Sequence, residues 1–160
     1  ASVIRRLPPN FLCTSGKRKR FNMAGIACVY FSEEEETVRL EYDRGIGSLC
    51  RKQPLTTFWA KVKLRRVVDL ADPVVLKHMV VGAKDLSAPW VGATVPTLMQ
   101  ELGNAVAANG HNISAIRYPS DAAKVASKAG HNVVIFRDQI KAPDFVHILG
   151  PGKEILQKWP

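Results

Sequence analysis

The polar residues most suggestive of chemistry in this chain are Arg20, Tyr30 and Glu41, which lie ten and eleven positions apart around one short apolar stretch. A hydroxyl follows much later at Ser120, within the segment Ile-Arg-Tyr-Pro-Ser at residues 116–120. A guanidinium fork suits a pyrophosphate, and a phenol can stack on a flat heterocycle while its hydroxyl stays in water. A cation, an aromatic ring, an acid and a hydroxyl so placed could hold a dinucleotide by its phosphates and break a glycosidic bond.

Glu41 differs from the four consecutive glutamates that precede it, which suit the positive end of a helix dipole and are expected to be solvated. Helical spacing puts Glu41 on the side shared with Thr37 and Val38, partly withdrawn from water. A carboxylate there is costly without a cationic partner. The partner is either a positive charge that develops on a substrate or, in an ordinary salt bridge, Arg39 or Arg44.

The other candidate residues also have simpler interpretations. Arg20 ends a basic run at residues 17–20 and could be one more surface cation. Tyr30, taken alone, fits a core or rim position. Ser120 follows a proline, in a pattern typical of a turn or helix start, so it could be a cap without a wider role. The sequence places no histidine where it could activate Ser120, which disfavours a serine hydrolase.

Short elements are predicted to position these residues. Residues 25–31 form an apolar run rich in strand formers, after which Ser32 caps a helix, with Glu35 completing a capping box, that ends near residue 43. Residues 58–65 alternate between apolar and polar side chains, as in a half-buried strand. Further elements are a helix that begins at Asp72-Pro73 and ends near residue 82, an irregular loop at 83–95, a helix from Pro96 to about residue 110, and strands at 113–118, 132–136 and 145–149.

Length and composition predict a single compact globular domain of mixed α/β (α+β) class. The chain has 160 residues, of which 46% are hydrophobic, and no apolar run is long enough to span a bilayer. Strands and helices are intermixed, with several strands adjacent in sequence. Few helices and the absence of a G-x-G-x-x-G motif after a strand disfavour a doubly wound parallel sheet.

Charge and cysteine content restrict the partners and the compartment. A formal net charge of +9 favours anionic partners: nucleic acid, phosphorylated small molecules or an acidic protein. The three cysteines form no C-x-x-C pair, which predicts neither a disulfide framework nor a zinc site and favours a reducing cytoplasm. The four histidines are scattered without metal-ligand spacing, so no metal is expected.

Several short motifs together resemble an RES domain, a family named for an arginine, a glutamate and a serine. The first half of the resemblance is Gly-Lys-Arg-Lys-Arg-Phe-Asn at residues 16–22, then Gly25, Val-Tyr-Phe-Ser at 29–32 and Glu41. The second half comprises Trp90, Leu102-Gly103, Ile-Arg-Tyr-Pro-Ser at 116–120 and Asn-Val-Val-Ile-Phe at 132–136. The match covers residues 16–140 in the correct order.

The resemblance implies a specific activity. RES proteins resemble ADP-ribosyltransferases in fold and are typically toxins of toxin–antitoxin pairs that deplete NAD by cleaving its nicotinamide–ribose bond. By matching position, Arg20 would hold the NAD phosphates and Tyr30 would pack on the nicotinamide side. Glu41 would stabilise the ribosyl cation, Ser120 would help orient the dinucleotide, and Asn132 would line the same pocket.

The expected protein is thus an NAD glycohydrolase or phosphorylase, with NAD as substrate and no cofactor or metal. Residues 1–15 would be an irregular lead-in and residues 16–160 the catalytic domain, and Arg18 is a rival for the role of Arg20. Two alternatives stay open: an ADP-ribosyltransferase that modifies a protein, and a basic nucleic-acid-binding module that uses residues 17–20 and 61–66. The implied partner is an antitoxin or immunity protein. A homodimer, a cytoplasmic location and delivery into another cell as a secreted effector are also compatible with the sequence.

Overall fold

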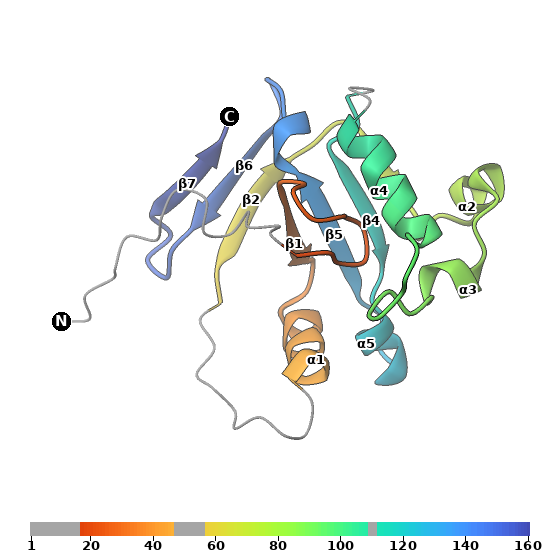
Figure 1. The fold of residues 1–160 in the computed structure, drawn as a ribbon. Helices are drawn as coiled ribbons and strands as arrows, with labels where there is room; N and C mark the ends of the chain where they lie inside the picture. Colours follow the sequence, from red (N-terminus) through yellow and green to blue (C-terminus); the bar gives the residue numbers. More distant parts are fainter. Residues whose placement is uncertain (1–16, 47–56, 109–111) are drawn as a thin grey trace.

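A computed structural model describes residues 17–46, 57–108 and 112–160, which form two small sheets with helices around them (Figure 1). Among the strands of these residues, β3 and β4 pair in parallel and the other pairs are antiparallel. The mixed α+β class is therefore confirmed. In the described part of the chain, no helix combines the length and apolar character needed to cross a membrane.

Each sheet collects strands that are distant in the sequence. The four-stranded sheet has the order β1 (Cys28–Ser32), β5 (His131–Phe136), β4 (Ala115–Pro119) and β3 (Val67–Asp69). The three-stranded sheet has the order β2 (Trp59–Lys63), β6 (Phe145–Leu149) and β7 (Ile155–Trp159). The helices are α1 (Glu35–Ile46), α2 (Pro73–Met79), α3 (Ala83–Leu86), α4 (Leu98–Ala108) and α5 (Asp121–Val125), with a 3₁₀ turn at Arg137–Gln139.

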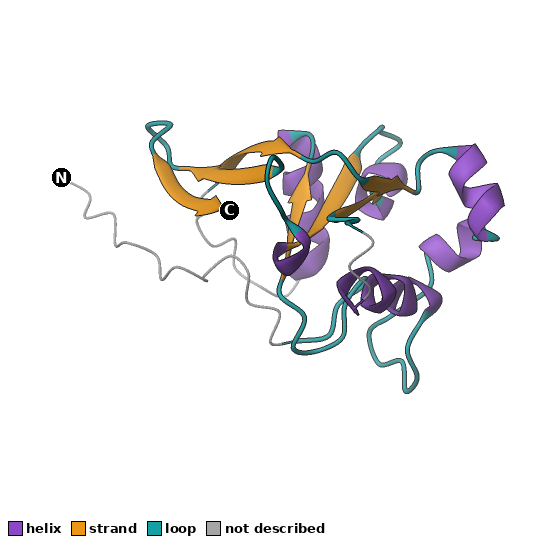
Figure 2. Cartoon of the chain, turned by 90° about the horizontal axis from the view of Figure 1, so that it is seen from above, coloured by secondary structure: helices purple, strands orange, loops and turns teal. Residues whose placement is uncertain are grey.

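The four-stranded sheet lies between the helices α2–α4 and the three-stranded sheet (Figures 1 and 2). Because successive side chains of a strand point to opposite faces, each face has its own core. On one face Ile116 and Val134 pack with Met99 of α4. On the other face Val29 and Ile135 pack with β6 and with Trp159 of β7.

Most of the predicted elements are confirmed. The strands expected at 25–31, 58–65, 113–118, 132–136 and 145–149 correspond to β1, β2, β4, β5 and β6, and the helix after Pro96 is α4. Asp72 caps α2, since its Oδ1 accepts a hydrogen bond of 2.8 Å from the Val74 N–H. Cys28 is buried in the core cluster, as a small core residue should be. The expected lead-in at residues 1–15 and the other two cysteines, Cys13 and Cys50, lie outside the described residues.

The predicted start of the first helix is wrong. Ser32 does not cap α1, because β1 extends through Ser32, which pairs with Asn132 of β5. The residue directly before α1 is Glu34, whose carbonyl accepts from the Val38 N–H at 3.2 Å. Glu35 therefore belongs to the first helical turn and forms an ion pair with Arg39 rather than completing a capping box.

Other boundaries also differ from expectation. The second helix, α2, ends at Met79 because Val80 takes the left-handed conformation (φ 56°) that closes a helix. The loop expected at 83–95 begins with the short helix α3, where Asp85 accepts a hydrogen bond from the Gly82 N–H. The expectation also omitted β3, α5 and β7, the first two of which have only three and five residues. Such lengths are too short to show a period.

Candidate active site

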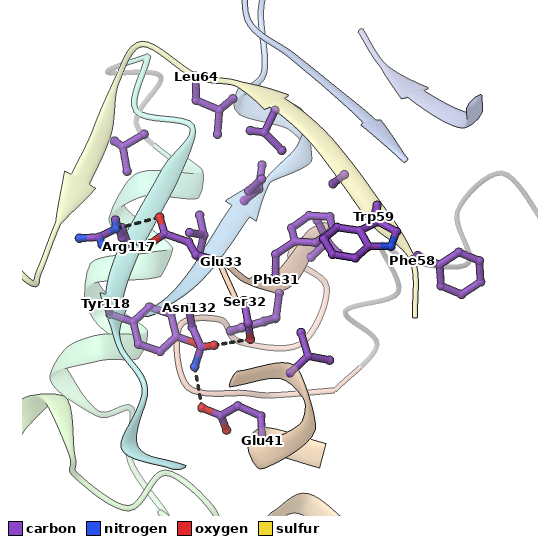
Figure 3. Close-up of a pocket in the computed structure, with 18 of the residues that line it drawn as sticks. Phe31, Ser32, Glu33, Glu41, Phe58, Trp59, Leu64, Arg117, Tyr118 and Asn132 are labelled. Atoms are coloured by element: carbon purple, nitrogen blue, oxygen red, sulfur yellow. Dashed lines mark hydrogen bonds and ion pairs between the residues drawn. The ribbon is translucent and has the colours of Figure 1, made fainter. Parts of the chain in front are cut away.

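The carboxylate of Glu41 is held by two side chains from other elements. Its Oε1 accepts hydrogen bonds from the Ser120 Oγ at 2.7 Å and from the Asn132 Nδ2 at 2.6 Å (the second is drawn in Figure 3). Glu41 is half-buried, as predicted, and among the described residues it forms no ion pair. Arg39, one of its two expected salt-bridge partners, binds Glu35 instead.

Ser120 serves two purposes at once. Its Oγ accepts from the Ala123 N–H at 3.1 Å, which makes Ser120 the N-cap of α5. An oxygen that accepts at the cap still has its own proton to donate, and that proton goes to Glu41. The cap interpretation is therefore confirmed, but it does not exclude a wider role. Ser120 is only 2% exposed, so its position is fixed by packing as well.

Asn132 lies at the start of β5 and is 6% exposed. Its side-chain amide joins two neighbours, because Nδ2 donates to Glu41 while Oδ1 accepts from the Ser32 Oγ at 2.6 Å (Figure 3). The sequence analysis expected Asn132 in the pocket but did not place Ser32 there. No local signal pointed to Ser32, since its role depends on the register of β1 against β5.

Glu41, Ser32, Asn132 and the buried Tyr118 line a cleft of about 980 Å³. The cleft continues along the gap between the two sheets, where its walls are mostly apolar (Figure 3). Its volume is at the upper end of the range of about 300–1,000 Å³ that is usual for small-molecule sites. The apolar wall includes Val29, Phe31, Phe58, Trp59, Val62 and Ile135.

Arg20 lies beside the turn that carries Ser120, and it is not among the residues that line the cleft. Its guanidinium forms an ion pair of 2.7 Å with Asp121 and donates to the carbonyl of Leu86, leaving the side chain 18% exposed. Asp121 directly follows Ser120, so Arg20 is bound to the same turn as Glu41. The rival Arg18 is tied to the loop before α4, through the carbonyls of Ala93 and Val95 and the side chain of Gln100.

Tyr30 lines the cleft, but its hydroxyl does not stay in water as expected. The hydroxyl donates to the Asn22 Oδ1 at 2.8 Å and accepts from the Phe21 N–H at 3.0 Å. Burial raises the pKa of Tyr30 well above its ordinary value of 10.0. The physical reason is that residues 19–22 fold back over the strand, which the sequence pattern could not show. The ring of Tyr30 and the cation of Lys19 are also in contact, with Nζ 5.4 Å from the ring centroid.

Arg117 forms a second polar group on the cleft wall that sequence reasoning did not single out. Its guanidinium donates to both carboxylate oxygens of Glu33, at 2.9 and 3.0 Å, and to those of Asp69, at 3.0 and 3.2 Å. The hydrogen bonds to Glu33 raise the pKa of Arg117 despite its partial burial. This pairing fixes the turn before α1 against β3 and β4.

One group of side chains has the composition of a metal site. Glu33, Glu34 and His131 each offer a ligand atom within 4.8 Å of the others. The two carboxylates already have partners: Glu33 binds Arg117, and Glu34 accepts from the Thr37 hydroxyl and the His131 N–H. The Arg117 cation neutralises the charge of Glu33, and the donors to Glu34 occupy acceptor positions that a metal ion would need, so we assign no metal to the group.

Comparison with known families identifies the family of the chain. The RES domain family model matches residues 11–156, and the chain therefore belongs to the RES domain family. No curated protein and no solved structure matches the chain. Membership suggests, in general terms, an NAD-related and toxin-associated function of an enzymatic kind, and proteins of this family are typically paired with antitoxins.

Proposed function

We propose that this protein degrades NAD by cleaving the bond between nicotinamide and ribose. The observation that carries the proposal is the pattern of hydrogen bonds to the carboxylate of Glu41. Both of its hydrogen-bond donors act on Oε1, and Oε2 has no hydrogen-bond partner within residues 17–46, 57–108 and 112–160. A carboxylate at the cleft, oriented by neutral donors and without a cation, is suited to a positive charge that the substrate itself develops.

The proposed chemistry follows from that charge. When the glycosidic bond breaks, its electron pair passes to the pyridine nitrogen, so that neutral nicotinamide leaves and positive charge remains on the ribose. Because Glu41 is held in place before the reaction, it stabilises that charge without reorganising. Water or phosphate then attacks the ribose carbon and loses a proton to the solvent, giving ADP-ribose or its phosphate ester.

The remaining residues take supporting roles in this proposal. Arg20 holds the phosphates, with Asp121 fixing its guanidinium beside the Glu41 turn. Tyr30 is one of the residues that line the cleft, and its hydroxyl holds residues 21 and 22 in place. Ser120 and Asn132 keep Glu41 oriented. This differs from the expectation that Ser120 would orient the dinucleotide itself.

The decisive experiment measures nicotinamide release from NAD by the wild-type protein and by Glu41→Gln. Glutamine keeps an acceptor oxygen for Ser120 and Asn132 but removes the charge, so the fold should survive while the rate falls by about 10²–10³. Glu101→Gln, at an exposed position of α4, is the matched control and should retain the wild-type rate. Circular dichroism verifies that both variants are folded. NAD consumption by Glu41→Gln at the wild-type rate would show that the mechanism is wrong.

The products separate the remaining alternatives. With labelled NAD, free ADP-ribose or its phosphate ester supports hydrolysis or phosphorolysis, whereas label on protein supports an ADP-ribosyltransferase. Salt-sensitive binding to polynucleotide without any loss of NAD would instead favour the nucleic-acid-binding alternative.

A further inference from the structure

We propose that Ser32 is a positioning residue for Glu41 and that it acts through the amide of Asn132. The inference rests on the proposed function, because it concerns the acid of that same site. The sequence pattern had placed this serine at a helix cap. The evidence for the new role is the direction of the two hydrogen bonds of the Asn132 amide and the register of β1 against β5.

The direction of the hydrogen bonds is set by what each group can do. A carboxylate only accepts, so Asn132 must present its NH₂ group to Glu41, where the distance from Nδ2 to Oε1 is 2.6 Å. The amide oxygen of Asn132 is thereby turned to the opposite side, toward Ser32. There the Ser32 hydroxyl donates to it at 2.6 Å (Figure 3). A donor at position 32 therefore selects the amide orientation that Glu41 requires.

The strand register brings Ser32 and Asn132 together. They are directly opposite each other in the antiparallel pair of β1 and β5. The next pair along the two strands is Glu33 and His131, and it is joined by a hydrogen bond of 2.9 Å from the Glu33 N–H to the His131 carbonyl. Since hydrogen-bonded and non-hydrogen-bonded pairs alternate, Ser32 and Asn132 form a non-hydrogen-bonded pair, the kind in which side chains approach most closely.

Loss of the Ser32 hydroxyl would leave the Asn132 Oδ1 without its donor in a side chain that is 6% exposed. Glu41 then becomes the only one of these two partners that holds the amide, so the amide can turn away and its NH₂ group is presented to the carboxylate less of the time. Ser120 would still donate to Glu41, so the acid would be less well oriented rather than released. The expected defect is therefore in the rate of the chemical step, not in substrate binding.

The first test compares kcat and KM for nicotinamide release in Ser32→Ala and Ser32→Thr. We expect Ser32→Ala to lower kcat by about tenfold with KM unchanged, which corresponds to about 1.4 kcal/mol, the net contribution of one good hydrogen bond. Ser32→Thr, which keeps the donor, should restore most of the rate. Ser114→Ala is the matched control, because Ser114 is fully buried and its hydroxyl has no partner among the described residues. This control should leave kcat unchanged.

A double-mutant cycle with Asn132→Ala tests whether Ser32 acts through Asn132. If it does, adding Ser32→Ala to Asn132→Ala should cause no further loss of kcat. Additive losses, a wild-type kcat in Ser32→Ala, or a rise in KM with unchanged kcat would each overturn the proposal. The last outcome would mean that the hydroxyl contacts the substrate directly.

A readout independent of activity keeps this inference separate from the proposed function. The side-chain NH₂ resonances of Asn132 in a ¹⁵N-labelled sample should shift or broaden in Ser32→Ala and stay unchanged in Ser114→Ala. If the wild-type protein releases no nicotinamide, the proposed function fails, while these resonances still decide whether Ser32 orients the amide. Unchanged Asn132 resonances in Ser32→Ala would refute the inference, even where Asn132→Ala does not fold.

Discussion

Arg20 and Glu41 are connected through two consecutive residues of the chain. Arg20 forms an ion pair of 2.7 Å with Asp121, and the preceding residue, Ser120, donates a hydrogen bond of 2.7 Å to Glu41. The two side chains thus come from the N-terminal segment and from α1, yet both attach to the start of α5. This arrangement sets the spacing between a cation and an acid without any direct contact between them.

The two rival arginines should give different defects. Arg20→Ala should raise the KM for NAD by about tenfold or more, because loss of a charge-assisted contact to phosphate weakens binding. Arg18→Ala should mainly lower the melting temperature, since Arg18 binds the carbonyls of Ala93 and Val95 and the side chain of Gln100. Steady-state kinetics and thermal unfolding of both variants make the comparison. A raised KM for Arg18→Ala together with an unchanged KM for Arg20→Ala would exchange their roles.

Tyr30→Phe should lower the free energy of unfolding by about 1 kcal/mol, because it leaves the Phe21 N–H and the Asn22 Oδ1 without the hydroxyl that joins them. Urea unfolding at neutral pH measures the loss. An unchanged stability would show that the hydroxyl does not hold the N-terminal segment. Tyr42→Phe is unsuitable as a control because Tyr42 has an interaction of its own, and Tyr118→Phe, in the same core, provides a better comparison.

The same tyrosine should make stability depend on alkaline pH. Burial raises the pKa of Tyr30 above its ordinary value, and burial also raises the pKa of Tyr118. Above pH 10 the unfolded chain loses these protons while the folded protein keeps them, so the free energy of unfolding falls as the pH rises. Tyr30→Phe should reduce that slope between about pH 10 and 11. A slope equal to that of the wild type would mean that Tyr30 ionises in the folded protein.

Gly103→Ala should disturb the segment that carries Arg20. A Cβ at position 103 would lie 1.7 Å from the carbonyl oxygen of Phe21, and since that atom belongs to the backbone, α4 or residues 19–22 must move. We expect a loss of about 2–3 kcal/mol in the free energy of unfolding, together with a raised KM for NAD. Ala105→Ser, at an exposed position of α4, is the control and should change stability by less than about 0.5 kcal/mol.

The parts of the site that depend on local pattern could be predicted from the sequence. Helical spacing placed Glu41 on a half-buried side of α1, and the sequence Pro-Ser-Asp at residues 119–121 indicated that Ser120 could be a helix cap. The parts that depend on contacts between distant segments could not be predicted. Ser32 matched a capping box locally, and only its pairing with Asn132 made it a strand residue. The Tyr30 hydroxyl was expected in water because nothing in the sequence indicates that residues 19–22 cover it.

The Ser120 hydroxyl connects Glu41 to the backbone amide of Ala123, because it donates to the first and accepts from the second. The Ala123 N–H donates to Ser120, and Ala123 is 1% exposed, so its exchange with deuterium requires the short α5 to open at its first turn. Any opening that unravels this turn also detaches a donor from Glu41 and the anchor of Arg20. The hydrogen–deuterium exchange rate of the Ala123 amide thus measures how often the candidate site opens locally in the folded protein, well below the melting temperature.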